Sequence, residues 1–169
     1  MQTLYLMLGY PGSGKTTTAK IIHELTGAVH LWADKVRRER FMSPTHSHTE
    51  NIELYDHLNE VTAELLEAGN SVVFDTNFNF YKDREKLRKI ASEHNANTIL
   101  IWVRAPKDVA KERATQDAHK QHTRILGNMP EERWEKISNN LEAPHEDEKV
   151  IEVDGTKVTK EYIKGLLNL

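Results

Sequence analysis

One segment near the start of the chain, GYPGSGKTTTAK from Gly9 to Lys20, limits the possible folds more than any other. It matches the pattern G-x-x-x-x-G-K-[ST] and directly follows an apolar run. In this pattern the glycines let backbone N–H groups point at phosphate oxygens, the lysine reaches the terminal phosphates, and the last hydroxyl binds Mg²⁺. The sequence therefore predicts a strand, a loop and a helix that bind a nucleoside triphosphate. The residues expected to contact it are Gly12, Ser13, Gly14, Lys15, Thr16 and Thr17.

Five short apolar runs alternate with longer amphipathic segments. The runs are TLYLML, AVHLWA, SVVF, TILIWV and KVIEV, which begin at Thr3, Ala28, Ser71, Thr98 and Lys149. Near-continuous apolar strands are typical of a parallel sheet that is covered on both faces. Helices are expected from the glycine loop to about Leu25, after Asp34, and over 52–68, 81–94, 107–118, 130–141 and 159–167. We therefore predict an α/β fold of the P-loop NTPase class, a five-stranded parallel sheet with helices on both faces.

The length of 169 residues fits a single domain over 1–169, and a polar, basic segment at about 114–130 is a candidate mobile lid. A formal net charge of −3 argues against broad nucleic-acid coating, although it leaves room for a local basic groove. The absence of cysteine excludes disulfides and thiolate chemistry. The apolar runs are too short to span a membrane, and the first leads directly into the glycine loop. We therefore expect a cytoplasmic protein without a membrane partner.

Two polar clusters follow predicted strands. In WADKVRRER, Asp34 comes directly after the second strand and Arg37 follows about one helical turn later. A carboxylate at this place could accept the proton of an attacking hydroxyl, or it could simply cap the helix. In VVFDTNFN, Asp75 ends the third strand and could hold Mg²⁺, or it could belong to a turn rich in Asn and Asp. We favour the functional interpretation for Asp75 and leave both open for Asp34.

The three clusters GYPGSGKTT, DKVR and DTNFN, in this order, resemble the small phosphate-loop kinases of the polynucleotide 5′-hydroxyl kinase type. They also resemble the wider group of zeta-toxin-like and AAA-type predicted kinases. The likeness covers roughly residues 1–141. The glycine loop is shared by very many proteins, whereas D-x-x-R after the second strand with D-T-N after the third is much more selective.

The resemblance implies a kinase domain that uses ATP and Mg²⁺, with Lys15 on the donor phosphates and Thr16 and Asp75 at the metal. It implies that Asp34 is the general base and that Arg37 binds or orients the acceptor. Asp75, Thr76 and Asn77 would line the acceptor pocket, and Gly155 and Thr156 would contact the adenine.

The resemblance also implies lid arginines on the donor phosphates, for which Arg113 and Arg124 are the candidates. Such an arginine neutralises charge in the transition state of phosphoryl transfer. The spacing departs from the family, whose lids carry two arginines close together, so either Lys120 or Arg124 could do this work.

The resulting hypothesis is an ATP-dependent kinase with a hydroxyl acceptor, for which the resemblance favours the 5′-hydroxyl of a polynucleotide. The alternatives are a kinase for a small molecule such as a sugar, nucleoside or antibiotic, and a nucleotide-binding ATPase with no dedicated acceptor. The base-reading N-K-x-D and the D-x-x-G of GTPases are missing, so a GTP switch has no support. The sequence decides neither the acceptor nor the oligomeric state.

Overall fold

A computed structural model describes residues 1–120, 122–123 and 125–169. Its five strands form one parallel sheet, as the sequence predicts, and the strand order in this sheet is β2-β3-β1-β4-β5. The strands are β1 (Thr3–Leu8), β2 (Val29–Trp32), β3 (Val72–Asp75), β4 (Asn97–Arg104) and β5 (Val150–Asp154). The first strand lies at the centre, so the glycine loop that follows it leaves the sheet between β3 and β4.

Helices connect these strands. They are α1 (Lys15–Thr26), α2 (Ala33–Arg40), α3 (His48–Glu67), α4 (Tyr81–Glu93), α5 (Lys107–Thr115), the 3₁₀ turn η1 (Ala118–Lys120), α6 (Glu131–Asn139) and α7 (Lys160–Leu166). Among the residues that the structure describes, no helix is both long enough and apolar enough to cross a membrane.

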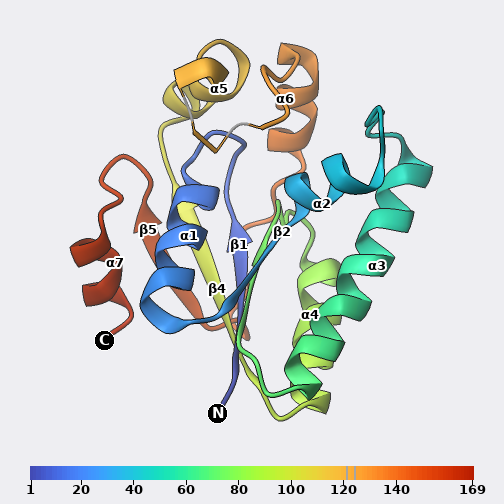
Figure 1. Cartoon of the computed structure of the whole chain (residues 1–169). Coiled ribbons are helices and arrows are strands. Elements are labelled where there is room, and N and C mark those ends of the chain that lie inside the picture. Colours follow the sequence, from blue (N-terminus) through green and yellow to red (C-terminus); the bar gives the residue numbers. More distant parts are fainter. Residues whose placement is uncertain (121, 124) are drawn as a thin grey trace.

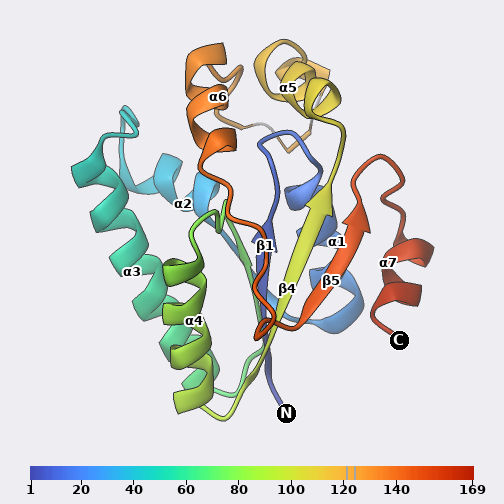
Figure 2. The same cartoon turned by 180° about the vertical axis from the view of Figure 1, so that it is seen from behind.

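The helices cover both faces of the sheet. Figures 1 and 2 show α3 and α4 together on one side and α1 and α7 on the other. In β1, Leu4, Leu6 and Leu8 point into the core beneath α3 and α4, whereas Tyr5 and Met7 point into the core beneath α1 and α7. Successive side chains of a strand point to opposite faces, so a central strand with two covered faces is apolar throughout.

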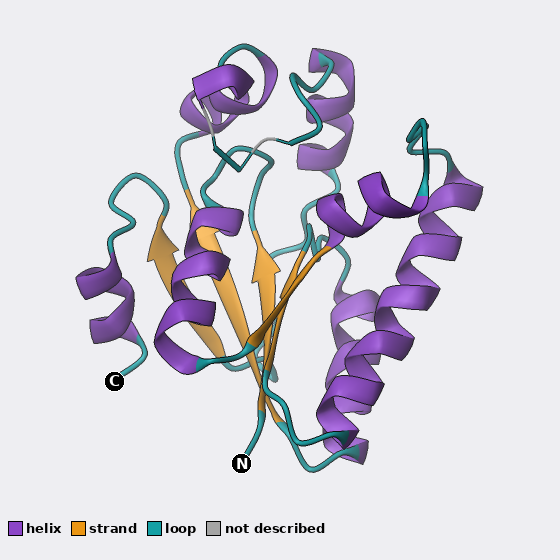
Figure 3. Ribbon diagram, viewed as in Figure 1, coloured by secondary structure: helices purple, strands orange, loops and turns teal. Residues whose placement is uncertain are grey.

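The remaining helices gather at one end of the sheet. Figure 3 shows α5 and α6 beyond the arrowheads of the strands, with α2 beside them. A small core of its own holds α5 against α6, in which Trp134 is almost fully buried. Ligands of open α/β folds bind outside the carboxyl ends of the strands, so this end is where a site is expected.

Two helices begin earlier than the sequence predicted. The third helix begins at His48 rather than at residue 52, because the Ser47 side chain accepts a hydrogen bond from the Glu50 amide and caps it. The second begins at Ala33 with Trp32 at its cap position. The capping alternative for Asp34 is therefore wrong, and its carboxylate lies in the first turn of α2.

Candidate active site

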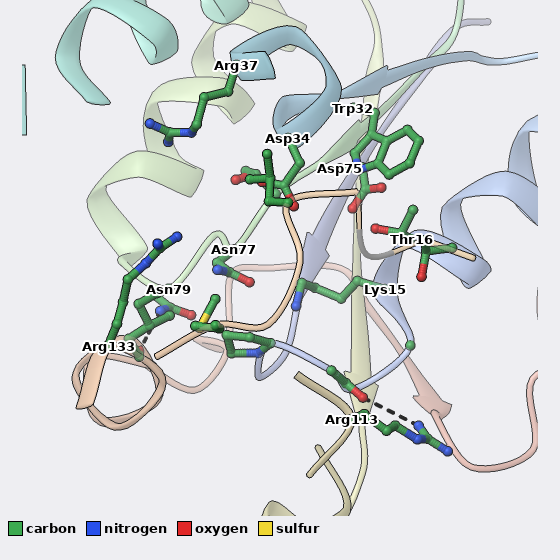
Figure 4. A pocket seen from close by; sticks show the side chains of 18 of the residues that line it. Lys15, Thr16, Trp32, Asp34, Arg37, Asp75, Asn77, Asn79, Arg113 and Arg133 are labelled. Carbon is green, nitrogen blue, oxygen red and sulfur yellow. Dashed lines mark hydrogen bonds between the residues drawn. The ribbon is translucent and has the colours of Figure 1, made fainter. Parts of the chain in front are cut away.

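A cleft of about 720 Å³ lies at the carboxyl ends of β1, β2 and β3. The phosphate loop forms one wall, and residues of α2, α3, α6 and the loop after β3 form the opposite wall (Figure 4). Helices from both halves of the chain therefore enclose a single space in front of the glycine loop.

The phosphate loop is held in shape by close backbone packing. Gly12 has a φ of 85°, and a Cβ at this position would lie 2.1 Å from the carbonyl oxygen of Ala110 on α5. Only glycine fits such a conformation and such a close approach. The buried Lys15 ammonium donates hydrogen bonds to the carbonyls of Gly9 and Tyr10, both at 2.9 Å. The lysine therefore lies folded across the loop, next to the space for the phosphates.

A second loop packs against the first. A Cβ on Gly155 would come within 1.9 Å of the Ser13 carbonyl oxygen, so the loop after β5 touches the phosphate loop backbone to backbone. Asp154 closes this turn by accepting hydrogen bonds from the amide and the hydroxyl of Thr156, and these bonds lower the pKa of Asp154. The tight contact brings Thr156 to the edge of the cleft.

Arg113, at the end of α5, connects the two loops. Its Nη1 donates to the carbonyl oxygen of Gly155 at 3.2 Å and to that of Gly12 at 3.4 Å (Figure 4). The guanidinium therefore lies on the side of the cleft formed by the phosphate loop. Whether it contacts phosphates stays a prediction.

Asp75 ends β3 and is buried, with 3% of its surface exposed. Its Oδ2 is 2.9 Å from Nε2 of His30, which lies on the neighbouring strand β2. The His30 ring stacks in parallel on Trp32, and the Lys20 ammonium lies 4.9 Å from the centre of the Trp32 ring. One carboxylate oxygen of Asp75 is thus held by histidine, while Figure 4 shows the carboxylate facing Thr16 across the cleft.

Arg37 lines the cleft but points its guanidinium at α3. Nη1 donates to Oε1 of Glu50 at 2.5 Å and Nη2 donates to Oδ1 of Asn51 at 2.8 Å. Burial alone would raise the pKa of Glu50, but hydrogen bonds from Thr45, Arg37 and His46 outweigh it and lower the pKa to about 2. The predicted acceptor ligand Arg37 is therefore engaged in joining α2 to α3, and its contact with an acceptor stays a prediction.

The loop after β3 is held from both sides. The Tyr55 hydroxyl lies 2.7 Å from the Thr76 hydroxyl, and burial raises the pKa of this tyrosine. Asn79 donates from Nδ2 to the carbonyl of Ile137 on α6 at 2.8 Å. Thr76 and Asn77 consequently face the cleft from a fixed loop.

Arg84 lies beneath this loop rather than at the mouth of the cleft. It is fully buried and forms a bidentate ion pair with Glu148, with Nε 2.7 Å from Oε1 and Nη2 3.0 Å from Oε2. Its Nη1 also donates to the carbonyl of Phe78 at 2.8 Å. Arg84 therefore fixes the loop after β3 from behind.

Most residues predicted to form the site line this one cleft. They are Gly12, Gly14, Lys15, Thr16, Thr17, Asp34, Arg37, Asp75, Thr76, Asn77, Arg113, Gly155 and Thr156. Ser13 is the exception: it is fully buried behind the loop, and its amide donates to Tyr10. Arg124 lies outside the described residues, and the alternative Lys120 pairs with Asp117 at 3.1 Å.

The sequence did not indicate several other residues of the cleft, among them Tyr55, Arg133 and Lys136. Arg133 and Lys136 lie three residues apart on α6, and Ile137 and Asn140 continue the same helical face. This spacing was visible in the sequence, but nothing in it showed which face of the helix would meet a cleft.

Solved structures share this fold. A candidate kinase from Chloroflexus aurantiacus is 19% identical with a TM-score of 0.78, and the match covers 99% of this chain and 97% of the other. A gluconokinase from Sinorhizobium meliloti is 20% identical with a TM-score of 0.68, covering 99% and 89%. An APS kinase from Mycobacterium tuberculosis, solved with AMPPNP and APS, is 16% identical with a TM-score of 0.69, covering 99% and 96%.

None of these three neighbours is described as a polynucleotide kinase. No curated protein matches the sequence. The model of a family described as an AAA domain matches residues 4–144, which is most of the chain and includes the phosphate loop and both polar clusters. The chain therefore belongs to this AAA domain family.

Proposed function

We propose that this protein is a kinase that transfers the γ-phosphoryl group of ATP to a hydroxyl of a small polar molecule. The observation that carries the proposal is the placement of Asp34 and the loop after β3 across one cleft from the phosphate loop (Figure 4). A protein that only binds a nucleotide, without transferring its phosphate, has no need of a carboxylate and a polar loop in that position.

On the donor side, the amides of the phosphate loop and the start of α1 would bind the phosphates of ATP. Lys15 would exchange its hydrogen bonds with the Gly9 and Tyr10 carbonyls for bonds to the terminal phosphates. The loop with Gly155 and Thr156 would contact the base, since it packs directly on the phosphate loop. Arg113, beside both loops, is placed to neutralise charge on the transferred group.

The oxygen atoms of two side chains, one at the start of α1 and one at the end of β3, fit Mg²⁺. Hydroxyl and carboxylate oxygens are ligands that this ion prefers, and the Thr16 hydroxyl and the Asp75 carboxylate both line the cleft. We expect Thr16 and Asp75 to hold Mg²⁺, which would supply positive charge to neutralise the phosphates. His30 would keep Asp75 in its orientation through Oδ2.

On the acceptor side, Asp34 would accept the proton of the hydroxyl as its oxygen attacks the γ-phosphorus. The bond from phosphorus to the β,γ-bridging oxygen breaks, and ADP leaves. Asn77 and Thr76 would orient the alcohol through hydrogen bonds, and the ion pair of Arg37 with Glu50 would hold α2 at the right distance.

The size of the cleft favours a small acceptor. Its volume of about 720 Å³ must hold both the nucleotide and the acceptor, and sites for small molecules span about 300–1,000 Å³. The gluconokinase and the APS kinase with the same fold are named for small-molecule acceptors. Both points favour a small molecule over the polynucleotide that the sequence resemblance suggested.

A polynucleotide 5′-hydroxyl remains the second candidate, because cations at the cleft, among them Arg133 and Lys136, could contact the phosphates next to such an end. Transfer of radiolabelled γ-phosphate from ATP to a panel of sugars, nucleosides, aminoglycosides and 5′-hydroxyl oligonucleotides separates the two candidates. The proposal predicts label in at least one small alcohol and far less in the oligonucleotides. Label in the oligonucleotides alone would establish the second candidate instead.

A further inference from the structure

The two faces of α6 carry opposite charges. Glu131 and Glu135 turn toward α5, where they pair with Lys111 at 2.6 and 2.8 Å. Arg133 and Lys136 instead line the cleft, together with the uncharged Ile137 and Asn140. The helix therefore presents cations to the cleft and uses two of its acids to attach itself to α5.

The cleft-facing surface of α6 is fixed relative to both walls. The Trp134 side chain is buried, and its Nε1 donates to the Pro11 carbonyl in the phosphate loop at 2.9 Å. On the other side, Asn79 donates to the Ile137 carbonyl. These contacts hold Arg133 and Lys136 at a set distance from the phosphate loop and from the loop after β3.

Arg133 is further oriented by the segment before α3. Its Nη2 lies 2.9 Å from Nδ1 of His46. Since a guanidinium can only donate, Nδ1 of His46 is the acceptor in this contact. In the view of Figure 4 Arg133 is drawn on the far side of Asn77 from Lys15.

The other cationic side chains of the cleft make contacts elsewhere in the site. Lys15 belongs to the phosphate loop, and Arg113 binds the carbonyls of Gly12 and Gly155 on the nucleotide side. The charge of Arg37 is balanced by the buried Glu50. No carboxylate among the described residues forms an ion pair with Lys136.

We propose that the acceptor alcohol carries an anionic group, a carboxylate or a phosphate, which Arg133 and Lys136 bind at the α6 end of the cleft. The acceptor hydroxyl then points toward Asp34 and the γ-phosphate, away from this anionic group. This inference rests on the proposed kinase function and narrows its class of substrate. Two cations on one rigid helical face bind an oxyanion through charge-assisted hydrogen bonds.

Matched pairs of alcohols test it: glucose with gluconate, glycerol with glycerate, glycerol with glycerol 3-phosphate, and a nucleoside with its 3′-monophosphate. The ratio of kcat/KM between the anionic and neutral members measures the selectivity. Because charge-assisted hydrogen bonds are stronger than neutral ones, we expect the accepted anionic member to be favoured about ten- to a hundredfold. Comparison of the pairs that differ by a carboxylate with the pairs that differ by a phosphate shows which of the two oxyanions the site binds.

Arg133→Met and Lys136→Met should each reduce this ratio about tenfold, mainly through KM, and Arg133→Lys should restore part of it. Lys164→Met, on the exposed face of α7 away from the cleft, is the matched control and should leave the ratio unchanged. Higher salt should also reduce the wild-type ratio.

The two proposals fail in different ways. If neutral and anionic alcohols are phosphorylated equally well, or if the α6 variants keep the wild-type ratio, the anionic acceptor is wrong and the kinase function stands. If the protein binds ATP but phosphorylates none of these alcohols or the wider panel, the kinase function is wrong and this inference fails with it.

Discussion

Arg37 on α2 and Glu50 on α3 form a buried ion pair whose charged atoms are 2.5 Å apart, with 4% and 6% of the two residues exposed. Asp34 lies one turn before Arg37 in the same short helix. A helix of this length has little stability of its own and depends on tertiary contacts. The ion pair therefore sets where the Asp34 carboxylate lies relative to the phosphate loop.

Glu50→Gln should destabilise the fold by about 3 kcal/mol at pH 7, because it leaves the buried Arg37 guanidinium without a counter-charge. The pKa of Glu50 is lowered from 4.5 to about 2, so its contribution is complete above about pH 4.5 and is lost as the pH falls toward 2. Urea unfolding of wild type and variant at pH 7 and pH 3 measures this. The difference in stability should shrink at pH 3, and an equal difference at both values would contradict the assignment.

His30→Ala should weaken Mg²⁺ binding, because Oδ2 of Asp75 loses its partner and the carboxylate is free to turn. Loss of such a partner typically costs about 10- to 100-fold in metal affinity. Titrating Mg²⁺ against the rate of ATP turnover gives the half-maximal concentration for each protein. His94→Ala, at the end of α4, serves as the control. If the half-maximal Mg²⁺ concentration is the same for His30→Ala and His94→Ala, His30 does not position Asp75.

Gly155→Ala should raise the KM for ATP at least tenfold, since its Cβ would lie 1.9 Å from the Ser13 carbonyl and force the two loops apart. Gly165→Ala in α7 is the matched control. Nothing lies within 4 Å of its Cβ, and replacing a helical glycine by alanine should stabilise the fold by about 0.5–1 kcal/mol. Steady-state kinetics and thermal unfolding of both variants check this pair. Unchanged kinetics in Gly155→Ala would show that contact between the loops does not shape the nucleotide site.

The succession of strands and helices along the chain could be predicted from the sequence, because apolar runs and helical faces are local patterns that the folded chain keeps. The order of the strands within the sheet could not be predicted in this way. The phosphate loop, Asp34 and Asp75 could be placed as well, since residues at the ends of parallel strands meet at one edge. The start of α3 could not be predicted accurately, because the capping Ser47 lies within a polar stretch that resembles a loop.

The partners of charged residues could not be predicted. His30 and Asp75 are 45 residues apart, Arg84 and Glu148 are 64 apart, and both pairs exist only because of the strand order and the path of the chain before β5. Contacts of this kind follow from the assembled sheet rather than from any local pattern.

Transfer to a hydroxyl with Asp34 as the base can be tested in one paired measurement. ADP and phosphorylated alcohol are quantified together from labelled ATP, for wild type and for Asp34→Asn, with an accepted alcohol present. We predict equal amounts of both products in wild type, and a fall of about 10²–10⁴ in their rate of formation in the variant with ATP binding intact. ADP formed with inorganic phosphate alone would show that the protein is an ATPase rather than a kinase for these alcohols. Unchanged transfer in Asp34→Asn would show that Asp34 is not the base.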